Sequence, residues 1–426
     1  MSSTQVSKPT GPLEIVEKDI PELGERQGYG TRKSSISKKS KAIAARAEVT
    51  LAITFIVSAF IVSALPSSLL PIHYQIPKAM AQVEDNRESA WLSTTQNYHT
   101  SNSNITTSTN SSSANIPAAA IGPTIPPKGY LVKEIPDGLY WLTDGAYQTM
   151  FMVTDKGVVA VDAPPSIGKN YLKAIAEVTN KPVTNVIYSH AHLDHIGAAD
   201  IFPKNGTYIA QDEVAASLQE AKASAANASM VPPIPTVTFS KSYTLNVGGQ
   251  TLQLDYYGVN HSPGNIFIYA PKQMTLMLVD VIWPGWVPFP YLGLAQDVAG
   301  FIKAHDIALN NYNFDTFIGG HLTRIGTRND VVVAREFVSD LEKAAAQANK
   351  QVPFPEIAKQ VGQAAKAFLS TNTYTDALDQ RCTQIMLPKW ENRLGGAQQF
   401  MSSHCYTMAE ALRIDPTMAL TQNSTS

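Results

Sequence analysis

The sequence predicts an α+β domain over residues 128–350, in which sheets are covered by helices. Short β-like runs alternate there with helical ones in a mixed order, which does not fit a doubly wound parallel sheet. An apolar run (51–72) and a run of Ser, Thr, Asn and Gln (93–114) precede the domain, and several helices are expected after it. We therefore expect a transmembrane helix, a disordered stalk, a folded domain and a C-terminal helical appendage.

Residues 51–72 carry no charged side chain and are long enough to span the hydrocarbon core of a bilayer. Acidic residues mix with basic ones after this run, whereas the segment before it is basic, so the positive-inside rule places the N-terminus in the cytoplasm. We predict a cytoplasmic basic tail (1–48) and a membrane anchor (49–72), with the catalytic domain outside the cytoplasm. The basic residues before the run are Arg32, Lys33, Lys38, Lys39, Lys41 and Arg46.

Two alternatives to the anchor are a buried core helix and a cleaved signal peptide. A core helix would not follow a basic, Ser-rich run. The triplet Ala79-Met80-Ala81 has the small-x-small pattern of a cleavage site, yet it lies well beyond the apolar run. Secretion after cleavage therefore stays the alternative localisation.

The segment after the anchor is too polar to bury a core, which predicts a disordered stalk over residues 73–127. We expect the folded domain to begin at Lys128 and the helical appendage to cover 351–426. Prolines stiffen the end of the stalk: Pro117, Pro123, Pro126 and Pro127.

Composition excludes some partners. The 33 basic and 35 acidic residues give a formal net charge of −2, so nucleic acid is not expected to bind. Two cysteines, Cys382 and Cys405, are too few for a disulfide scaffold and could form one bridge outside the reducing cytosol. Both fall on expected helices of the appendage, which either caps the site or mediates homodimerisation.

Within the domain, alternating apolar residues and turn signals place most of the elements. A helix is expected over 171–179, and a long amphipathic helix after Arg328. Strands are expected at 139–143, 149–153, 158–161, 183–188, 251–257, 266–269, 274–279 and 316–318.

Four metal-ligating side chains lie within the run HAHLDH, directly after an expected strand. His190 and His192 share one face of an extended segment and can converge on one ion. Asp194 and His195 come where Gly197 indicates a turn into a helix, so they can face a second ion. Clustered imidazoles and a carboxylate are costly unless a cation stabilises them, so the run predicts a metal site.

Further ligands must come from elsewhere, because these side chains cannot hold two ions by themselves. Three candidates lie at strand ends: His261 in the sequence HSPGN, Asp280 after an apolar strand, and His321 after Gly319-Gly320. Each alone is a weak signal, since an Asp at a strand end is often a turn residue.

Together these motifs resemble the metallo-β-lactamase superfamily over residues 128–350. The resemblance implies an αββα sandwich with the site at one edge of its two sheets, and Asp162 supporting the site from below. It implies that His190, His192 and His261 bind one ion, that Asp194, His195 and His321 bind the other, and that Asp280 bridges them.

Two departures from the motifs of the superfamily narrow the range of activities that we expect. Broad-spectrum β-lactamases of the superfamily often carry Cys at the position of Asp280 and a nearby Lys, and residues 281–286 contain no Lys. This counts against antibiotic hydrolysis as the main role. A histidine at position 192, in place of an acidic residue, argues against the di-iron flavoprotein branch.

The expected cofactors are two Zn²⁺ ions, with iron or manganese as alternatives. A hydroxide bridging them would attack an ester, lactone, amide, thioester or phosphoester of a small-molecule substrate, with Asp194 orienting it and passing on its proton. The alternative function is an iron-dependent oxidoreductase of the same fold, similar to a sulfur or persulfide dioxygenase. A binding protein with a dead site is a third interpretation.

The aromatic, Pro-rich segment 283–294 allows two interpretations. It forms an apolar wall over the site, or it packs on the domain or on an oligomer partner. The candidate substrate-binding residues are Trp283, Trp286, Phe289 and Tyr291.

Overall fold

The computed structural model describes residues 116–361 and 371–420, and the predicted membrane anchor lies outside these ranges. Among the helices in these ranges, none combines the length and the apolar character of a membrane span. The packed region extends upstream of Lys128, where the sequence predicted its start. In the turn η1 (Ala118–Ala120), Ala120 is buried, and its carbonyl accepts a hydrogen bond from Trp286 Nε1 at 3.0 Å.

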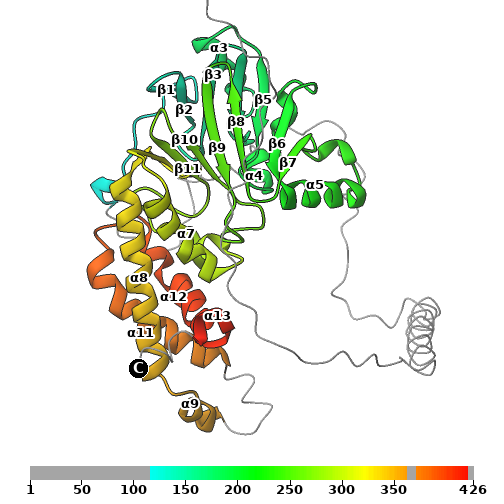
Figure 1. Cartoon of the computed structure of the whole chain (residues 1–426). Coiled ribbons are helices and arrows are strands. Elements are labelled where there is room, and N and C mark those ends of the chain that lie inside the picture. Colours follow the sequence, from blue (N-terminus) through cyan, green and yellow to red (C-terminus); the bar gives the residue numbers. More distant parts are fainter. Residues whose placement is uncertain (1–115, 362–370, 421–426) are drawn as a thin grey trace, which may run out of the picture. The chain divides into compact units, whose positions relative to one another are not determined.

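The first sheet has seven strands that lie in sequence order (Figure 1). Its antiparallel half is β1 (Leu131–Ile135), β2 (Leu139–Thr143), β3 (Gln148–Thr154) and β4 (Gly157–Val161). Its parallel half continues with β5 (Val183–Ile187), β6 (Thr207–Gln211) and β7 (Val237–Phe239). Parallel neighbours require crossovers, and these contain α3 (Asn170–Val178) and α5 (Asp212–Ser224).

The second sheet has six strands in the order β13-β12-β11-β10-β9-β8. Its strands are β8 (Ser242–Val247), β9 (Gln250–Asp255), β10 (Phe267–Ala270), β11 (Thr275–Leu278), β12 (Thr316–Ile318) and β13 (Gly326–Thr327). Its parallel pair, β11 and β12, is connected through α7 (Val298–Asn311). The helix α8 (Arg328–Gln351) follows β13 and begins with a capping box between Thr327 and Asp330.

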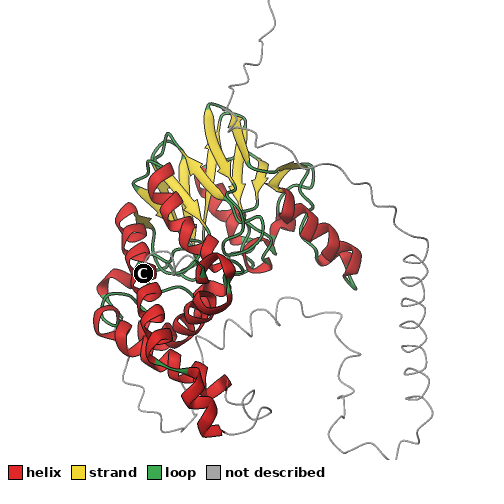
Figure 2. Cartoon of the chain, turned by 60° about the horizontal axis from the view of Figure 1, so that its bottom comes forward, coloured by secondary structure: helices red, strands yellow, loops and turns green. Residues whose placement is uncertain are grey.

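The two sheets pack face to face because side chains alternate along each strand. In β4, Val159 and Val161 belong to the core between the sheets, whereas Val158 and Ala160 belong to the core beneath the outer helices. The second sheet buries its other face in a cluster that contains Phe267 of β10 and residues of α7 and α8. Four layers result, with helices outside both sheets (Figure 2), and the expected αββα arrangement is confirmed.

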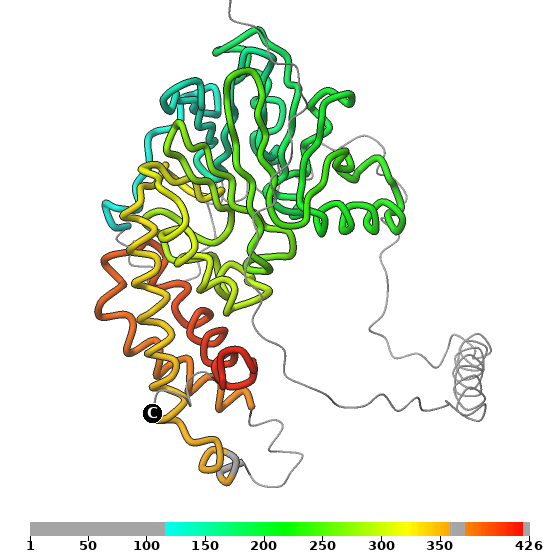
Figure 3. Tube along the Cα trace, viewed as in Figure 1, coloured from blue at the N-terminus to red at the C-terminus, as the bar shows by residue number. Residues whose placement is uncertain are grey.

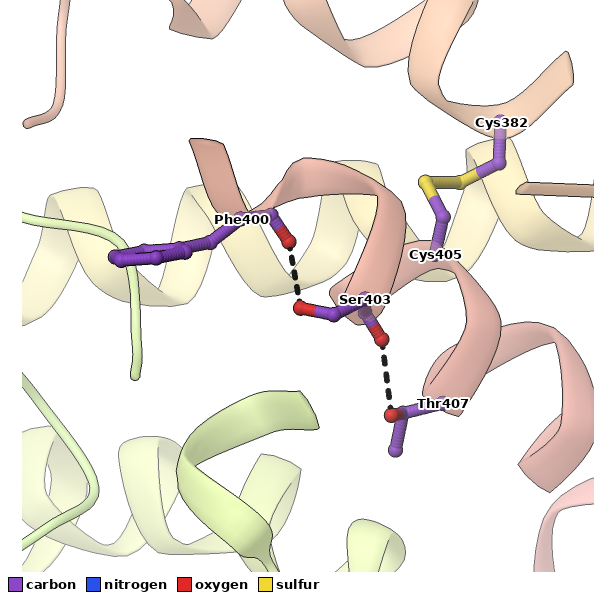
Figure 4. The surroundings of a disulfide bond; sticks show 5 residues. All are labelled: Cys382, Phe400, Ser403, Cys405 and Thr407. Atoms are coloured by element: carbon purple, nitrogen blue, oxygen red, sulfur yellow. Dashed lines mark hydrogen bonds between the residues drawn. A yellow bond between two sulfur atoms is a disulfide. The ribbon is translucent and has the colours of Figure 1, made fainter. Parts of the chain in front are cut away.

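The C-terminal helices are α9 (Phe354–Val361), α11 (Thr371–Trp390), α12 (Ala397–Ile414) and α13 (Pro416–Ala419). Figure 3 shows α11 and α12 beside α8, and all three contribute to the hydrophobic cluster that covers the second sheet. A disulfide between Cys382 and Cys405 joins α11 to α12, with the Cα atoms 5.7 Å apart (Figure 4). The appendage is therefore continuous with the core of the sandwich.

Candidate metal centre

The run HAHLDH begins directly beyond β5, at one edge of the first sheet. The backbone is still extended at His192 and then enters the short helix α4 (Leu193–Ile196). His190 and His192 consequently precede the change of direction, and Asp194 and His195 lie on the helix. This is the local geometry that the spacing of the four residues predicted.

Asp162 supports the run through its backbone. Asp162 follows β4 with a positive φ of 52°, and its Oδ1 accepts a hydrogen bond from the Ser189 N–H at 2.7 Å. The carboxyl is fully buried, and burial raises its pKa to about 6. The start of the HAHLDH run is thereby tied to the end of the neighbouring strand.

His261 lies in a loop of the second sheet that is closed by two asparagines. Asn260 Oδ1 accepts hydrogen bonds from the His261 N–H at 2.6 Å and from Asn265 Nδ2 at 2.8 Å. Asn265 Nδ2 also donates to the Val279 carbonyl at 2.9 Å. The loop that carries His261 is therefore attached to the residue directly before Asp280.

The ends of β11 and β12 bring in the remaining two side chains. Asp280 adopts a positive φ of 61°, and Gly320, with φ of 86°, precedes His321. A Cβ at Gly320 would lie 2.6 Å from Val279 Cγ1 and 3.3 Å from His195 Cε1, so a larger residue does not fit. The glycine lets the backbone before His321 approach the other ligands.

The seven predicted side chains form two groups, and within each group the candidate donor atoms lie within 4.8 Å of one another. Asp280 belongs to both. One group is His190, His192, His261 and Asp280, and the other is Asp194, His195, Asp280 and His321.

In the first group, His261 Nε2 lies 2.9 Å from His192 Nδ1 and 3.3 Å from Asp280 Oδ2. His190 Nε2 lies 3.7 Å from the same carboxylate oxygen. Ligand atoms at the corners of a tetrahedron around Zn²⁺ are separated by about 3.3 Å, given bonds of about 2.0 Å. The observed separations are of that size.

In the second group, the Nε2 atoms of His195 and His321 lie 3.0 Å apart. Asp280 Oδ2 lies 3.2 Å from His195 Nε2, and Asp280 Oδ1 lies 3.1 Å from His321 Nε2. Asp194 Oδ2 is 3.5 Å from His195 Nε2, and the Asp194 side chain is 43% exposed. The two oxygens of Asp280 thus face different imidazoles.

Burial lowers the pKa of His190, His192 and His261, that of His261 to about 4. These rings are therefore neutral, which is the form that binds a metal ion. Burial acts to raise the pKa of Asp280, but the neighbouring His195 and His321 outweigh it and hold the pKa well below its usual range. Burial likewise lowers the pKa of His195, and the Asp280 carboxylate reverses this, so the net pKa is raised.

The hydrogen bonding and the chemistry of the donor atoms also fit divalent cations. In the described ranges, His190 Nε2 is buried and has no hydrogen-bond partner. Such unpaired groups are costly unless another species satisfies them. Imidazole nitrogen and carboxylate oxygen are ligands of Zn²⁺ and also of iron and manganese, so the residues fit a pair of such ions.

Tyr147 is part of the site, although the sequence did not single it out. Its hydroxyl donates a hydrogen bond to Asp194 Oδ2 at 3.3 Å, and its ring lies 4.4 Å from that of His321 between centroids. Burial raises the pKa of Tyr147 far above its usual value, with the Asp194 charge adding to the effect. The start of β3 lies at the same sheet edge as the end of β5. This position at the edge was the signal in the sequence that could have identified Tyr147.

Gln148 is the second residue that sequence reasoning missed. Its side-chain Nε2 donates to the carbonyls of His321 at 2.7 Å, of Leu322 at 2.5 Å and of Arg324 at 3.0 Å. Its Oε1 accepts from Trp141 Nε1 at 3.0 Å, and the whole residue is buried. Gln148 therefore fixes the loop that carries His321.

The four candidate substrate-binding residues divide into two pairs. Trp283 is 4% exposed and belongs to the hydrophobic core, and Trp286 packs its ring against Gly395, so the packing interpretation describes both. Phe289 is 59% exposed and Tyr291 is 50% exposed. A role in substrate binding stays a prediction for this second pair.

A family model described as the metallo-beta-lactamase superfamily matches residues 142–303. Among curated proteins, the chain is 27% identical over 213 residues to the 2,4-dinitroanisole O-demethylase subunit alpha of Nocardioides sp. (strain JS1661), which covers 48% of this chain and 60% of the relative. It is 26% identical over 201 residues to the metallo-beta-lactamase type 2 of Elizabethkingia meningoseptica, covering 45% of this chain and 78% of the relative. The match thus spans less than two thirds of the demethylase subunit.

Among solved structures, a metallo-beta-lactamase from Pontibacter korlensis matches with a TM-score of 0.42 and 18% identity, over 49% of this chain and 99% of the other. A stereoselective inverting sec-alkylsulfatase from Pseudomonas sp. matches with a TM-score of 0.45 and 16% identity, over 69% of this chain and 52% of the other.

Proposed function

We propose that the chain is a metal-dependent hydrolase that uses two Zn²⁺ ions, as its match to the metallo-beta-lactamase superfamily over residues 142–303 suggests. The observation that carries the proposal is the pair of donor groups that share Asp280. His190, His192 and His261 would hold one ion and Asp194, His195 and His321 the other, with Asp280 between them. The substrate class is an ester, lactone, amide, thioester or phosphoester.

When bound, two such cations supply an activated water and polarise a carbonyl or phosphoryl oxygen. The protein's own contribution lies in burial and position. His190, His195 and Asp280 are almost fully buried, so bulk water is kept from the inner side of the site. Asp194 is the accessible carboxylate of the site, and its Oδ2 accepts from the Tyr147 hydroxyl. It can accept a proton at that oxygen and pass it to a leaving group.

The test is a panel of chromogenic esters, lactones, β-lactams and phosphodiesters, assayed with and without exhaustive chelation. We expect hydrolysis of at least one class, loss on chelation, and recovery on adding Zn²⁺. His192→Ala should lower kcat/KM by at least roughly 100-fold, since it removes a ligand. His305→Gln is the matched control, because His305 is a buried histidine on α7, outside both donor groups.

Activity that survives both chelation and His192→Ala would overturn the proposal. Stoichiometric iron after native purification, together with oxygen uptake, would favour the iron-dependent oxidoreductase instead. The β-lactam arm tests the expectation that antibiotic hydrolysis is not the main role.

We also propose that the catalytic domain lies outside the cytoplasm, attached to the membrane by residues 49–72. The Cys382–Cys405 disulfide supports this location, because disulfides persist in oxidising compartments. Protease treatment of intact spheroplasts should degrade the catalytic domain, whereas a protected domain would contradict the proposal.

A further inference from the structure

The segment that follows the metal centre contains a left-handed turn. The turn lies in α6 (Pro290–Leu294). The backbone angles φ and ψ are 58° and 42° at Tyr291, 57° and 41° at Leu292, and 66° and 29° at Gly293. Leu294 also has a positive φ, of 58°. Residues other than glycine rarely adopt this region, and consecutive ones do so more rarely still. Interactions from outside the turn must therefore hold it.

Two side chains of α12 supply these interactions. The Tyr291 N–H donates to Ser403 Oγ at 3.1 Å, and the Leu292 N–H donates to His404 Nδ1 at 3.2 Å. The Ser403 hydroxyl itself donates to the Phe400 carbonyl at 2.8 Å (Figure 4), which leaves its oxygen free to accept from the turn. Adjacent residues of one helix thus accept from adjacent residues of the turn.

His404 is suited to accept a hydrogen bond. It is fully buried, and burial lowers the pKa of its ring to about 3, so the ring is neutral and Nδ1 can accept. Its ring lies 6.0 Å from that of Phe337 on α8, and the next residue, Cys405, is bonded to Cys382. The acceptor is therefore held by the core of the helical appendage.

The turn also contacts the backbone around two candidate ligands. A Cβ at Gly293 would lie 2.5 Å from Trp283 Cη2 and 3.4 Å from the Asp280 carbonyl oxygen, so the turn lies directly against this part of the site. Just beyond the turn, the Gln296 N–H donates to the His261 carbonyl at 2.9 Å. The turn thus lies beside the backbone of Asp280 and His261.

The same segment presents large apolar side chains to solvent. Phe289, Tyr291 and Leu294 are 59%, 50% and 58% exposed. Leu193, between the candidate ligands His192 and Asp194, is also 51% exposed. Leu193 belongs to the HAHLDH run, and the other three side chains belong to the segment whose backbone contacts Asp280 and His261. Exposed apolar side chains in such segments are typical of a surface that binds an apolar ligand group.

We propose that Ser403 and His404 are positioning residues, which hold the left-handed turn so that its apolar side chains bind an alkyl or aryl group of the substrate beside the metal centre. The proposal rests on the proposed function, because it assigns a substrate class to the same site. It also gives the C-terminal appendage a role: α12 sets substrate preference without touching the reacting atoms.

The test compares two carboxylates of equal charge, acetate and octanoate, by calorimetric titration of the zinc-loaded full-length chain. We expect octanoate to bind at least roughly 100-fold more tightly than acetate, since six further methylene groups leave water at least in part. His404→Leu and Ser403→Ala should each reduce this preference by about tenfold and leave the acetate Kd unchanged.

Conservative variants separate positioning from general stability. Ser403→Thr keeps the acceptor oxygen and His404→Asn replaces the acceptor nitrogen by an amide oxygen, so both should restore the preference to within about threefold. Thr407→Val is the matched control, because Thr407 donates to the Ser403 carbonyl at 3.0 Å one turn further along α12 (Figure 4). It should leave the preference unchanged. Near-UV circular dichroism shows whether His404→Leu is folded. If it is unfolded, Ser403→Ala tests the positioning role by itself, because Ser403 is only half-buried.

An unchanged preference in folded Ser403→Ala and His404→Leu proteins would overturn the positioning role. Equal affinity of the unmodified chain for both carboxylates would overturn the substrate class. Because the titration needs no turnover, a chain that prefers octanoate but hydrolyses nothing in the chromogenic panel would refute the hydrolase and support the binding surface.

Discussion

The hydroxyl of Tyr147 donates a hydrogen bond to the carboxylate of Asp194 at 3.3 Å, across the gap between the start of β3 and the helix α4. Tyr147→Phe keeps the ring contact with His321 and removes this bond. Because Asp194 is half-exposed, water replaces part of the interaction, and we expect kcat to fall by about five- to tenfold. Steady-state kinetics on the substrate found by the panel measures this, with an unchanged unfolding midpoint as the control. A kcat equal to that of the unmodified enzyme would show that Asp194 does not need the phenol.

Gln148→Leu should weaken the loop that carries His321. The substitution leaves three loop carbonyls and Trp141 Nε1 without their partner in a buried place, which should destabilise the protein by about 2 to 4 kcal/mol. Gln273→Leu is matched, since Gln273 is also buried and donates to a carbonyl, that of Asp137. Urea unfolding should show a loss in both variants, and calorimetric zinc titration should show weaker binding only for Gln148→Leu.

The alternation of apolar and polar side chains along the chain was enough to predict most of the strands. Strands β2 and β12 have the predicted bounds, 139–143 and 316–318, because their apolar residues are bounded by clear turns. The strands β1, β6, β7, β8 and β13 were not predicted. Strand β7, for example, has only three residues and follows a Pro-rich stretch, and its existence depends on pairing with β6. Local alternation of side chains does not predict which distant segments pair with one another.

The juxtaposition of the donor side chains was predictable for a related reason. His190, His192, Asp194 and His195 are close in sequence, so their spacing alone placed them together. Tyr147 and Gln148 were missed because their roles depend on which strand end meets which loop. Likewise, no pattern within residues 290–294 predicts a left-handed turn, because its partners Ser403 and His404 come more than a hundred residues later.

His305 predicts a pH dependence of stability that is separate from the metal site. It is buried on α7, and burial lowers its pKa in the folded state to about 4, below the usual value of about 6.5. Below pH 6.5 the unfolded chain therefore takes up a proton that the folded chain does not, so stability falls as the pH falls from 6.5 towards 4 and is fully present above 6.5. The contribution of this residue is about 2 kcal/mol between pH 7 and pH 5.

The measurement is urea unfolding at pH 7 and pH 5 for the unmodified protein and for His305→Gln, both saturated with chelator. The difference between the two pH values should be about 2 kcal/mol smaller in the variant. Equal differences would mean that folding does not lower the pKa of His305.

Removing the disulfide should destabilise the appendage and, through it, the whole domain. The bridge joins residues 23 positions apart, and closing a loop of that length in the unfolded chain corresponds to about 3 kcal/mol. The double variant Cys382→Ala with Cys405→Ala should lose at least this much in urea unfolding, and the unmodified protein with reductant should show a similar loss. If reductant leaves the unfolding midpoint unchanged, the two cysteines are not bonded in the purified protein.

Asp280→Asn tests whether the two donor groups depend on each other. The Asp280 carboxylate oxygens lie 3.2 Å from His195 Nε2 and 3.1 Å from His321 Nε2, and Oδ2 also lies 3.3 Å from His261 Nε2. An amide of the same shape carries no charge, so two cations held close together would lose the anion between them. We expect metal analysis after dialysis to give at most one zinc per chain, against two for the unmodified protein. Asp306→Asn, which removes an exposed carboxylate paired with Arg335, should retain two. Two tightly held ions in Asp280→Asn would mean that the remaining six side chains suffice and that Asp280 does not bridge the metals.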